Sequence, residues 1–137
     1  SRAVTITVPP DSLMAFVQDL STWISWNEIL SARDHRPIMA NARQIQTPQI
    51  LLRRVNLRTD SLVVQWEFKG QQVIPGALYI TRAGSSSSVV QWYFDFTVSW
   101  YPWEKFGSII YDQQVGPAME RSLNNLKRQC EQKFSVL

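Results

Sequence analysis

The sequence has few of the side chains on which most enzyme chemistry depends. Its 137 residues include one cysteine, Cys130, and one histidine, His35. A single cysteine cannot form an intramolecular disulfide, which leaves the redox compartment open, and one histidine with one cysteine supplies too few ligands for a typical zinc site. The five glycines are isolated, which excludes a glycine-rich phosphate-binding loop. We therefore expect no metal and no cofactor.

Long apolar runs are also missing. No stretch of about 18 consecutive apolar residues occurs, so the chain as given contains no membrane-spanning segment. It begins without a methionine and almost inside a strand pattern, which predicts that a segment precedes Ser1. Such a segment can be a signal or an anchor. The expected location is therefore the cytoplasm, or a membrane surface reached only through an upstream anchor.

Basic residues exceed acidic ones without forming a block. Fourteen lysines and arginines against eleven acidic residues give a net charge of +3, but they are scattered along the chain. Nucleic-acid-binding proteins usually cluster their basic residues and interleave them with aromatics. The sequence therefore argues against a nucleic-acid partner and leaves the oligomeric state open.

Aromatic residues are abundant: six tryptophans, four tyrosines and six phenylalanines. Because each ring buries a large area, they indicate an aromatic-rich core or an aromatic-lined cavity. The length suits one domain, residues 1–137, with a sizeable core.

The first half of the chain reads as a strand followed by short helices. Apolar residues alternate in 3–8, and Pro9-Pro10 then opens a helical pattern over 10–19. Ser21 can cap a short helix through Trp26, which places Trp23 and Trp26 on one side. Residues 27–48 are poorly periodic, and we predict loops there with weak strands at 36–39 and 43–46.

The second half reads as hairpins and one long helix. The predicted strands cover 50–58, 61–68, 73–82 and 89–100, and Pro75 marks an edge or a bulge. An apolar stripe at three- and four-residue spacing predicts a helix over 103–134. Gly116-Pro117 predicts a kink there or two helices joined end to end. The simplest packing, an α+β fold, lays this helix across one antiparallel sheet.

The aromatic residues that share strand faces are the candidate cavity walls. Six aromatic side chains and one helix residue form this predicted ligand-binding set: Trp66, Trp92, Phe94, Phe96, Trp100, Trp103 and Met119. Core filling is the alternative role for each. Collectively they favour an apolar or aromatic ligand, because binding pockets are mostly lined this way.

Arg53 is the charged member of the candidate site. The pattern Leu51, Val55, Leu57 predicts that Arg53 faces the apolar side of its strand, where it would meet an anionic ligand or a buried carboxylate. The alternative is an arginine at a strand edge whose head reaches water. Pairing His35 with Cys130 is a weaker idea, because Cys130 lies on the apolar stripe of the helix. The sequence therefore identifies no catalytic residue.

Several motifs resemble those of the START-like (SRPBCC, helix-grip, birch-pollen-allergen-like) superfamily and its polyketide cyclase/dehydrase-type family. They are residues 4–10 leading into Phe16, the run from Leu20 through Trp23 to Trp26, and a C-terminal series comprising Pro102-Trp103, Asp112, Gly116, Glu120 and Asn125-Leu126-Lys127. The resemblance implies a curved antiparallel sheet of about seven strands around the long C-terminal helix, two short helices after strand one, and a cavity between them. Unlike many relatives, residues 31–48 lack glycines.

The resemblance implies three kinds of function. The leading hypothesis is non-catalytic binding of a hydrophobic or aromatic small molecule, lipid-like or polycyclic, between sheet and helix. A cyclase/dehydrase-type enzyme working without metal, with Arg53 polarising a carbonyl, is the second. The third is a protein-interaction module like the chaperone activators of this superfamily. The ligand itself is not determined by the sequence.

Overall fold

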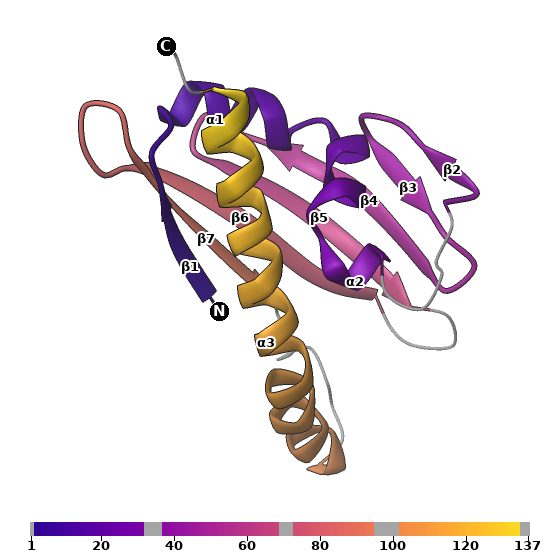
Figure 1. Ribbon diagram of the computed structural model, residues 1–137. Helices are drawn as coiled ribbons and strands as arrows, with labels where there is room; N and C mark the ends of the chain where they lie inside the picture. Colours follow the sequence, from indigo (N-terminus) through magenta and orange to yellow (C-terminus); the bar gives the residue numbers. More distant parts are fainter. Residues whose placement is uncertain (1, 32–36, 69–72, 95–101, 135–137) are drawn as a thin grey trace.

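The computed structural model describes residues 2–31, 37–68, 73–94 and 102–134, and it describes their side chains except at 31, 68 and 102–115. Within these ranges the chain forms one antiparallel sheet and four helical segments (Figure 1). The predicted end of the last strand, with Phe96 and Trp100, lies outside the described residues, as does His35.

The described part of the sheet has seven strands in the order β1-β7-β6-β5-β4-β3-β2. Their bounds are β1 Arg2–Ile6, β2 Met39–Ala40, β3 Gln44–Gln46, β4 Ile50–Leu57, β5 Ser61–Phe68, β6 Val73–Arg82 and β7 Ser88–Phe94. Strands β2 to β7 follow one another as a meander, and β1 pairs antiparallel with β7. The N-terminal strand β1 is therefore the edge strand at the side of the sheet opposite β2.

Three short helical segments follow β1. They are α1 (Pro10–Val17), the 3₁₀ helix η1 (Leu20–Ser25) and α2 (Glu28–Ser31). Proline at the first position of α1 suits a helix start because that N–H has no intrahelical partner. The carboxylate of Asp19, not Ser21, caps η1 by accepting the Ser21 N–H at 3.0 Å. Helix α2 was not predicted, and Asn27 Oδ1 caps it by accepting the Ile29 N–H at 3.1 Å.

The long helix α3 (Pro102–Lys133) confirms the predicted C-terminal helix. It runs as one element through Pro117, so the alternative of two helices joined end to end is wrong. Its apolar stripe is buried at Met119, Leu123, Leu126 and Cys130. Figure 1 shows the C-terminal half of α3 lying across the sheet and its N-terminal half continuing past the sheet's end. No helix within the described ranges is long and apolar enough to cross a membrane.

Alternation along the strands gives the sheet an inner face, covered by helices, and an outer face. Leu52, Trp66, Leu78 and Trp92 are buried on the inner face. Tyr79 and Tyr93 stack on the outer face with ring centroids 5.7 Å apart. Pro75 pairs in register with Gln65, so the predicted bulge is absent from the pairing of β6 with β5 at this position. The register shift lies in β4, between Arg54 and Asn56.

Candidate functional site

Four indole rings meet between the sheet and the helices. Trp23 and Trp26 come from η1 and its C-terminal end, Trp66 from β5 and Trp92 from β7, and each is at most 1% exposed. The ring centroids of Trp23 and Trp26 are 5.0 Å apart, and those of Trp66 and Trp92 are 6.2 Å apart in a stacked arrangement. Trp26 and Trp92 meet edge to face at 6.2 Å. We call these four residues the tryptophan cluster.

Phe94 extends the tryptophan cluster toward the end of the sheet. Its ring centroid lies 5.1 Å from Trp66 and 5.3 Å from Trp92. Unlike those tryptophans, Phe94 is only half-buried, and so is Ile74, which pairs with Trp66 across β5 and β6. Phe94 and Ile74 are partly buried apolar residues packed against the core beside the cluster, and we call them its rim.

The structure brings part of the predicted ligand-binding set together. Trp66, Trp92 and Phe94 are in mutual ring contact, and Met119 is 3% exposed on the stripe of α3. Phe96 and Trp100 lie outside the described residues, and Trp103 belongs to α3 but its side chain is not described. Trp23 and Trp26, which the sequence assigns to core packing, belong to the same cluster. Their three-residue spacing is the signal that places them on one side.

Hydrogen bonding differs between the indole N–H groups of the cluster. Trp23 Nε1 donates to the carbonyl oxygen of Val17 at 2.8 Å. Trp26 Nε1, Trp92 Nε1 and Asn27 Nδ2 are buried and have no acceptor among the residues that the structure describes. A buried donor without an acceptor destabilises a protein by about 1–3 kcal/mol. In folded proteins such donors are usually paired with another polar group or an ordered water.

Arg53 does not face the interior, so its predicted orientation is wrong. It is exposed on the outer face and donates to Gln65 Oε1 at 3.5 Å. The register shift after Arg54 changes which residues share a face. As a result, the apolar pattern Leu51, Val55, Leu57 does not lie on one side of β4.

The arginine that faces inward is Arg54. Its Nη1 donates to the carbonyl oxygen of Gln18 at 2.9 Å. Gln18 is the C-cap residue of α1, where carbonyl groups lack intrahelical partners. Arg54 therefore joins β4 to the end of α1.

Two rows of polar contacts hold α3 on either side of its apolar stripe. Toward β1, Arg2 Nε pairs with Glu120 Oε1 at 2.8 Å, and Lys127 Nζ donates to the Thr5 carbonyl at 2.7 Å. Toward η1 and α2, Arg121 pairs with Glu28 at 2.7 Å, and the Glu28 N–H donates to Ser122 Oγ at 2.9 Å. The C-terminal half of α3 is thus fastened to both neighbours.

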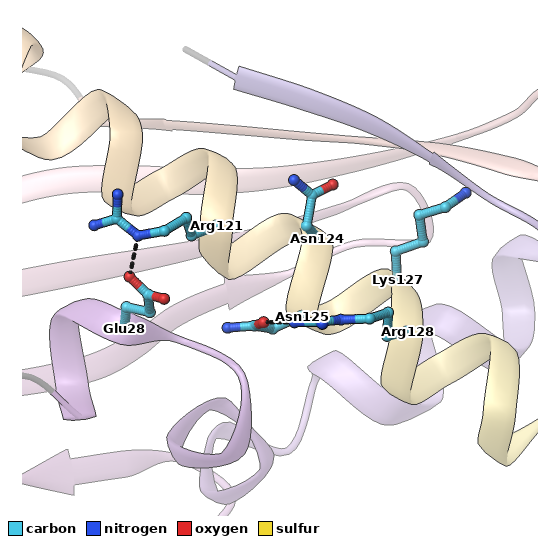
Figure 2. Close-up of a pocket in the computed structure, with 6 residues that line it drawn as sticks. All are labelled: Glu28, Arg121, Asn124, Asn125, Lys127 and Arg128. Atoms are coloured by element: carbon cyan, nitrogen blue, oxygen red, sulfur yellow. Dashed lines mark hydrogen bonds and ion pairs between the residues drawn. The ribbon is translucent and has the colours of Figure 1, made fainter.

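A polar hollow of about 490 Å³ lies on the outside of α3. Figure 2 shows the side chains that line it: Glu28, Arg121, Asn124, Asn125, Lys127 and Arg128. Its charged groups are engaged with one another or with neighbours, Arg121 with Glu28, Lys127 with Glu131, and Arg128 with Asn125 Oδ1. Every side chain that lines the hollow ends in a charged or carboxamide group.

Nucleophilic chemistry finds little support in the described residues. Burial raises the pKa of the Cys130 thiol to about 11, so the thiol is protonated at neutral pH. The thiolate is the reactive form of cysteine. Among the described residues, no group of three or more His, Cys, Asp or Glu side chains is placed to hold a metal ion.

Comparison with known proteins identifies the architecture. No protein-family model matches the sequence, and no curated protein matches it. Solved structures do match, among them CalU16 from Micromonospora echinospora, with a TM-score of 0.62 and 13% identity over 91% of this chain and 69% of that one. A START superfamily protein from Mycobacterium smegmatis matches with a TM-score of 0.64 and 12% identity, covering 96% of this chain and 95% of that chain.

A third similar structure is a truncated norcoclaurine synthase from Thalictrum flavum, with a TM-score of 0.59 and 9% identity over 99% of this chain and 92% of that one. At sequence identities this low, structural similarity shows a shared fold and does not show a shared function. The neighbours share the antiparallel sheet, the short helices after the first strand and the long C-terminal helix packed on the sheet. This chain has the START-like, helix-grip fold.

Proposed function

We propose that this protein binds a hydrophobic or aromatic small molecule between the sheet and α3, in contact with the tryptophan cluster and its rim. One observation carries the proposal: aromatic rings from η1, β5 and β7 converge on one region, and the outermost ring, Phe94, is only half-buried. Apolar ligand sites are lined mainly by such rings. The ligand would reach the cluster past Phe94 and Ile74.

The fold agrees with a small-molecule site, and the burial of Cys130 leaves that site without a thiolate nucleophile from this residue. The structures similar in fold include a norcoclaurine synthase and a START superfamily protein. The proposed binding requires no nucleophile. The protonated Cys130 thiol cannot act as a nucleophile at neutral pH, and the outward-facing Arg53 cannot polarise a carbonyl in the interior.

The cyclase/dehydrase alternative loses its carbonyl-polarising group. Arg53 is on the outer face, and the inward Arg54 is engaged with Gln18. The protein-interaction alternative requires an exposed apolar patch. Large apolar side chains are exposed among the described residues at Ile38, Met39, Val55, Leu57, Val73 and Tyr79. They are divided among the β2 edge, β4 and β6, which are not neighbouring strands.

The test is a binding titration with matched variants. The protein is titrated with a panel of polycyclic aromatics and fatty acids while tryptophan fluorescence is recorded. Phe94→Ala is expected to weaken binding of the best probe about tenfold, equivalent to about 1.4 kcal/mol, because the ligand loses an aromatic contact. Tyr79→Ala, on the outer face, is the control and is expected to leave affinity unchanged.

Native mass spectrometry of the protein from its own source provides an independent readout, a bound mass that organic solvent removes. The proposal is wrong if no probe changes tryptophan fluorescence and the purified protein carries no such mass. It is also wrong if Tyr79→Ala weakens binding as much as Phe94→Ala does.

A further inference from the structure

The polar hollow on the outside of α3 is built mainly from one stripe of that helix. Arg121, Asn125 and Arg128 follow one another at four- and three-residue spacing, which places them on one side of an α-helix. The volume of the hollow, about 490 Å³, is within the range of small-molecule sites. The hollow therefore offers hydrogen bonds and positive charge to a ligand of moderate size.

Arg128 is held by a relay of hydrogen bonds that begins at a buried residue. Asn125 Nδ2 donates to the carbonyl oxygen of Trp26 at 3.3 Å, and Asn125 Oδ1 accepts a hydrogen bond from Arg128 Nη2. Figure 2 shows the side chain of Arg128 running back along α3 beside Asn125. Among the described residues Arg128 has no carboxylate partner. Its guanidinium is therefore oriented while its charge stays uncompensated.

Arg121 lines the hollow one turn before Asn125. Its Nε donates to Glu28 Oε2 at 2.7 Å, and Glu28 is itself attached to α3 through the hydrogen bond from its backbone N–H to Ser122 Oγ. That contact uses one of the five N–H donors of a guanidinium, so the two Nη groups are left to donate. Arg121 and Asn125 are separated by about 6 Å along the helix axis. The two guanidinium groups therefore belong to consecutive turns of α3.

The other charged groups of the hollow are already paired. Lys127 Nζ pairs with Glu131 at 3.1 Å. Glu28 is the one carboxylate among the described lining residues, and it pairs with Arg121. An anion in the hollow therefore shares Arg121 with Glu28 and meets Arg128 without a competing carboxylate.

We propose that this hollow binds a phosphate monoester with a hydroxyl-bearing organic part, and that Arg128 and Arg121 donate to its phosphate oxygens. A phosphate monoester has a charge of about −1.5 to −2 at pH 7 and three acceptor oxygens, so it can engage both guanidinium groups. One guanidinium is enough for the two oxygens of a carboxylate. Asn124 is exposed, and its carboxamide is placed to bond the organic part. This site is separate from the interior region of the proposed function and does not depend on it.

Calorimetric titration of the protein with glucose 6-phosphate, glucose 6-sulfate and glucose tests the proposal. The sulfate ester has the same shape as the phosphate ester but only one negative charge. Glucose 6-phosphate is expected to bind at least about fivefold more tightly than the sulfate ester, equivalent to about 1 kcal/mol, because its attraction to the two guanidinium groups grows with its charge. Glucose is expected not to bind.

Arginine-to-glutamine variants identify the groups that hold the phosphate. Arg128→Gln is expected to weaken binding of glucose 6-phosphate about tenfold, equivalent to about 1.4 kcal/mol, because a charge-assisted hydrogen bond is lost. The double variant with Arg121→Gln is expected to abolish binding. Arg53→Gln, on the outer face of the sheet, removes the same charge and is the matched control, which is expected to leave affinity unchanged. Urea unfolding checks that each variant is folded.

A lipid headgroup can present the same phosphate monoester, so vesicles form the second arm of the test. Co-sedimentation is measured with vesicles of phosphatidylcholine and phosphatidic acid in a four-to-one ratio. Phosphatidylglycerol, a phosphate diester, replaces phosphatidic acid in the control vesicles. Binding of glucose 6-phosphate alone assigns the site to a soluble ligand, and binding of phosphatidic acid vesicles alone assigns it to a lipid.

In either arm, binding is expected to be lost in the double variant and kept in Arg53→Gln. The proposal is overturned if neither probe binds, if the phosphate and sulfate esters bind equally, or if Arg53→Gln weakens binding as much as Arg128→Gln does. All of these outcomes are independent of the titration with aromatic probes and leave the proposed function standing.

Discussion

Two glycines lie where a side chain would meet a neighbouring atom, and the neighbours differ. A Cβ on Gly76 would lie 2.9 Å from the carbonyl oxygen of Tyr93, which belongs to the backbone of the adjacent strand β7. A Cβ on Gly116 would overlap the guanidinium of Arg2, a flexible side chain. A backbone atom cannot move away without disturbing the ladder, whereas a side-chain tip can. Gly76 is therefore needed for the close approach of β6 and β7. Gly116 leaves room for the side chain of Arg2, which pairs with Glu120.

At this scale we predict different outcomes for the two alanine substitutions. Gly76→Ala is expected to destabilise the fold by about 2 kcal/mol, because β6 and β7 must separate. Gly116→Ala is expected to change stability by less than about 1 kcal/mol. The higher helix propensity of alanine, about 1 kcal/mol, offsets the loss of the exposed Arg2–Glu120 pair. Urea unfolding measures both, and equal losses at the two positions would contradict this account.

At the scale of elements, α3 is attached to the sheet by contacts with the chain that follows β1. Glu131 Oε2 accepts the backbone N–H of Thr7 at 2.8 Å and pairs with Lys127 Nζ at 3.1 Å. The hydrogen bond from Thr7, followed by the Lys127 contacts, holds the pKa of the Glu131 carboxyl below its usual 4.5. This carboxylate therefore links the end of α3 to the turn before α1.

The lowered pKa of Glu131 predicts a pH dependence with a definite sign. Its contribution to stability is fully present above the unfolded-state pKa near 4.5 and is lost as pH falls through the lower folded-state value. Glu131→Gln is expected to destabilise the fold by about 1 kcal/mol at pH 7, because the carboxylate is partly exposed. The difference from wild type should shrink below pH 4.5. Thermal unfolding from pH 3 to 7 measures this difference.

Glu67→Gln is the matched control for the loss of one negative charge, since Glu67 is exposed on β5 and distant in sequence from α3. Glu67→Gln is expected to lower the free energy of unfolding by less than about 0.5 kcal/mol at pH 7, the range typical of surface substitutions. A Glu131→Gln penalty that stayed constant down to pH 3 would show that the carboxylate contributes nothing through its charge.

At the scale of the whole molecule, the two faces of the sheet have different roles. The inner face contacts α1, η1 and α3 through buried apolar side chains, with Arg54 as a polar connection to Gln18. The outer face carries Arg53, Gln65 and the stacked pair Tyr79 and Tyr93. Neighbouring arginines in one strand thus belong to different environments.

This arrangement predicts opposite results for two neighbouring substitutions. Arg54→Leu is expected to destabilise the protein by about 1–2 kcal/mol, because the Gln18 carbonyl loses a charged donor. Arg53→Leu is expected to change stability by no more than about 0.5 kcal/mol and to leave probe affinity unchanged. Chemical denaturation and the fluorescence titration measure the two effects. A larger loss of stability for Arg53→Leu than for Arg54→Leu would contradict the placement of Arg53 on the outer face and Arg54 on the inner face.

The amino-acid sequence by itself determined the order and type of most elements. Strands β5 and β6 have the predicted bounds, and the stripe of α3 is buried as its spacing indicates. The described part of β7 also turns Trp92 and Phe94 inward as its alternation predicts. These features are readable because the period of apolar residues reports the direction of side chains in a regular strand or helix.

Only the tertiary structure decided which partners those side chains meet. The register shift in β4 interrupts the alternation of inward and outward side chains. The apolar pattern therefore predicted that Arg53 faces inward, whereas in the fold it is Arg54 that faces inward. Glu120 pairs with Arg2, 118 positions away, and the indole N–H of Trp23 donates to the Val17 carbonyl, six positions away on a preceding helix. Local periodicity contains no information about contacts between distant segments. The tryptophans are therefore visible in the sequence, but the contacts among Trp23, Trp26, Trp66 and Trp92 are visible only in the fold.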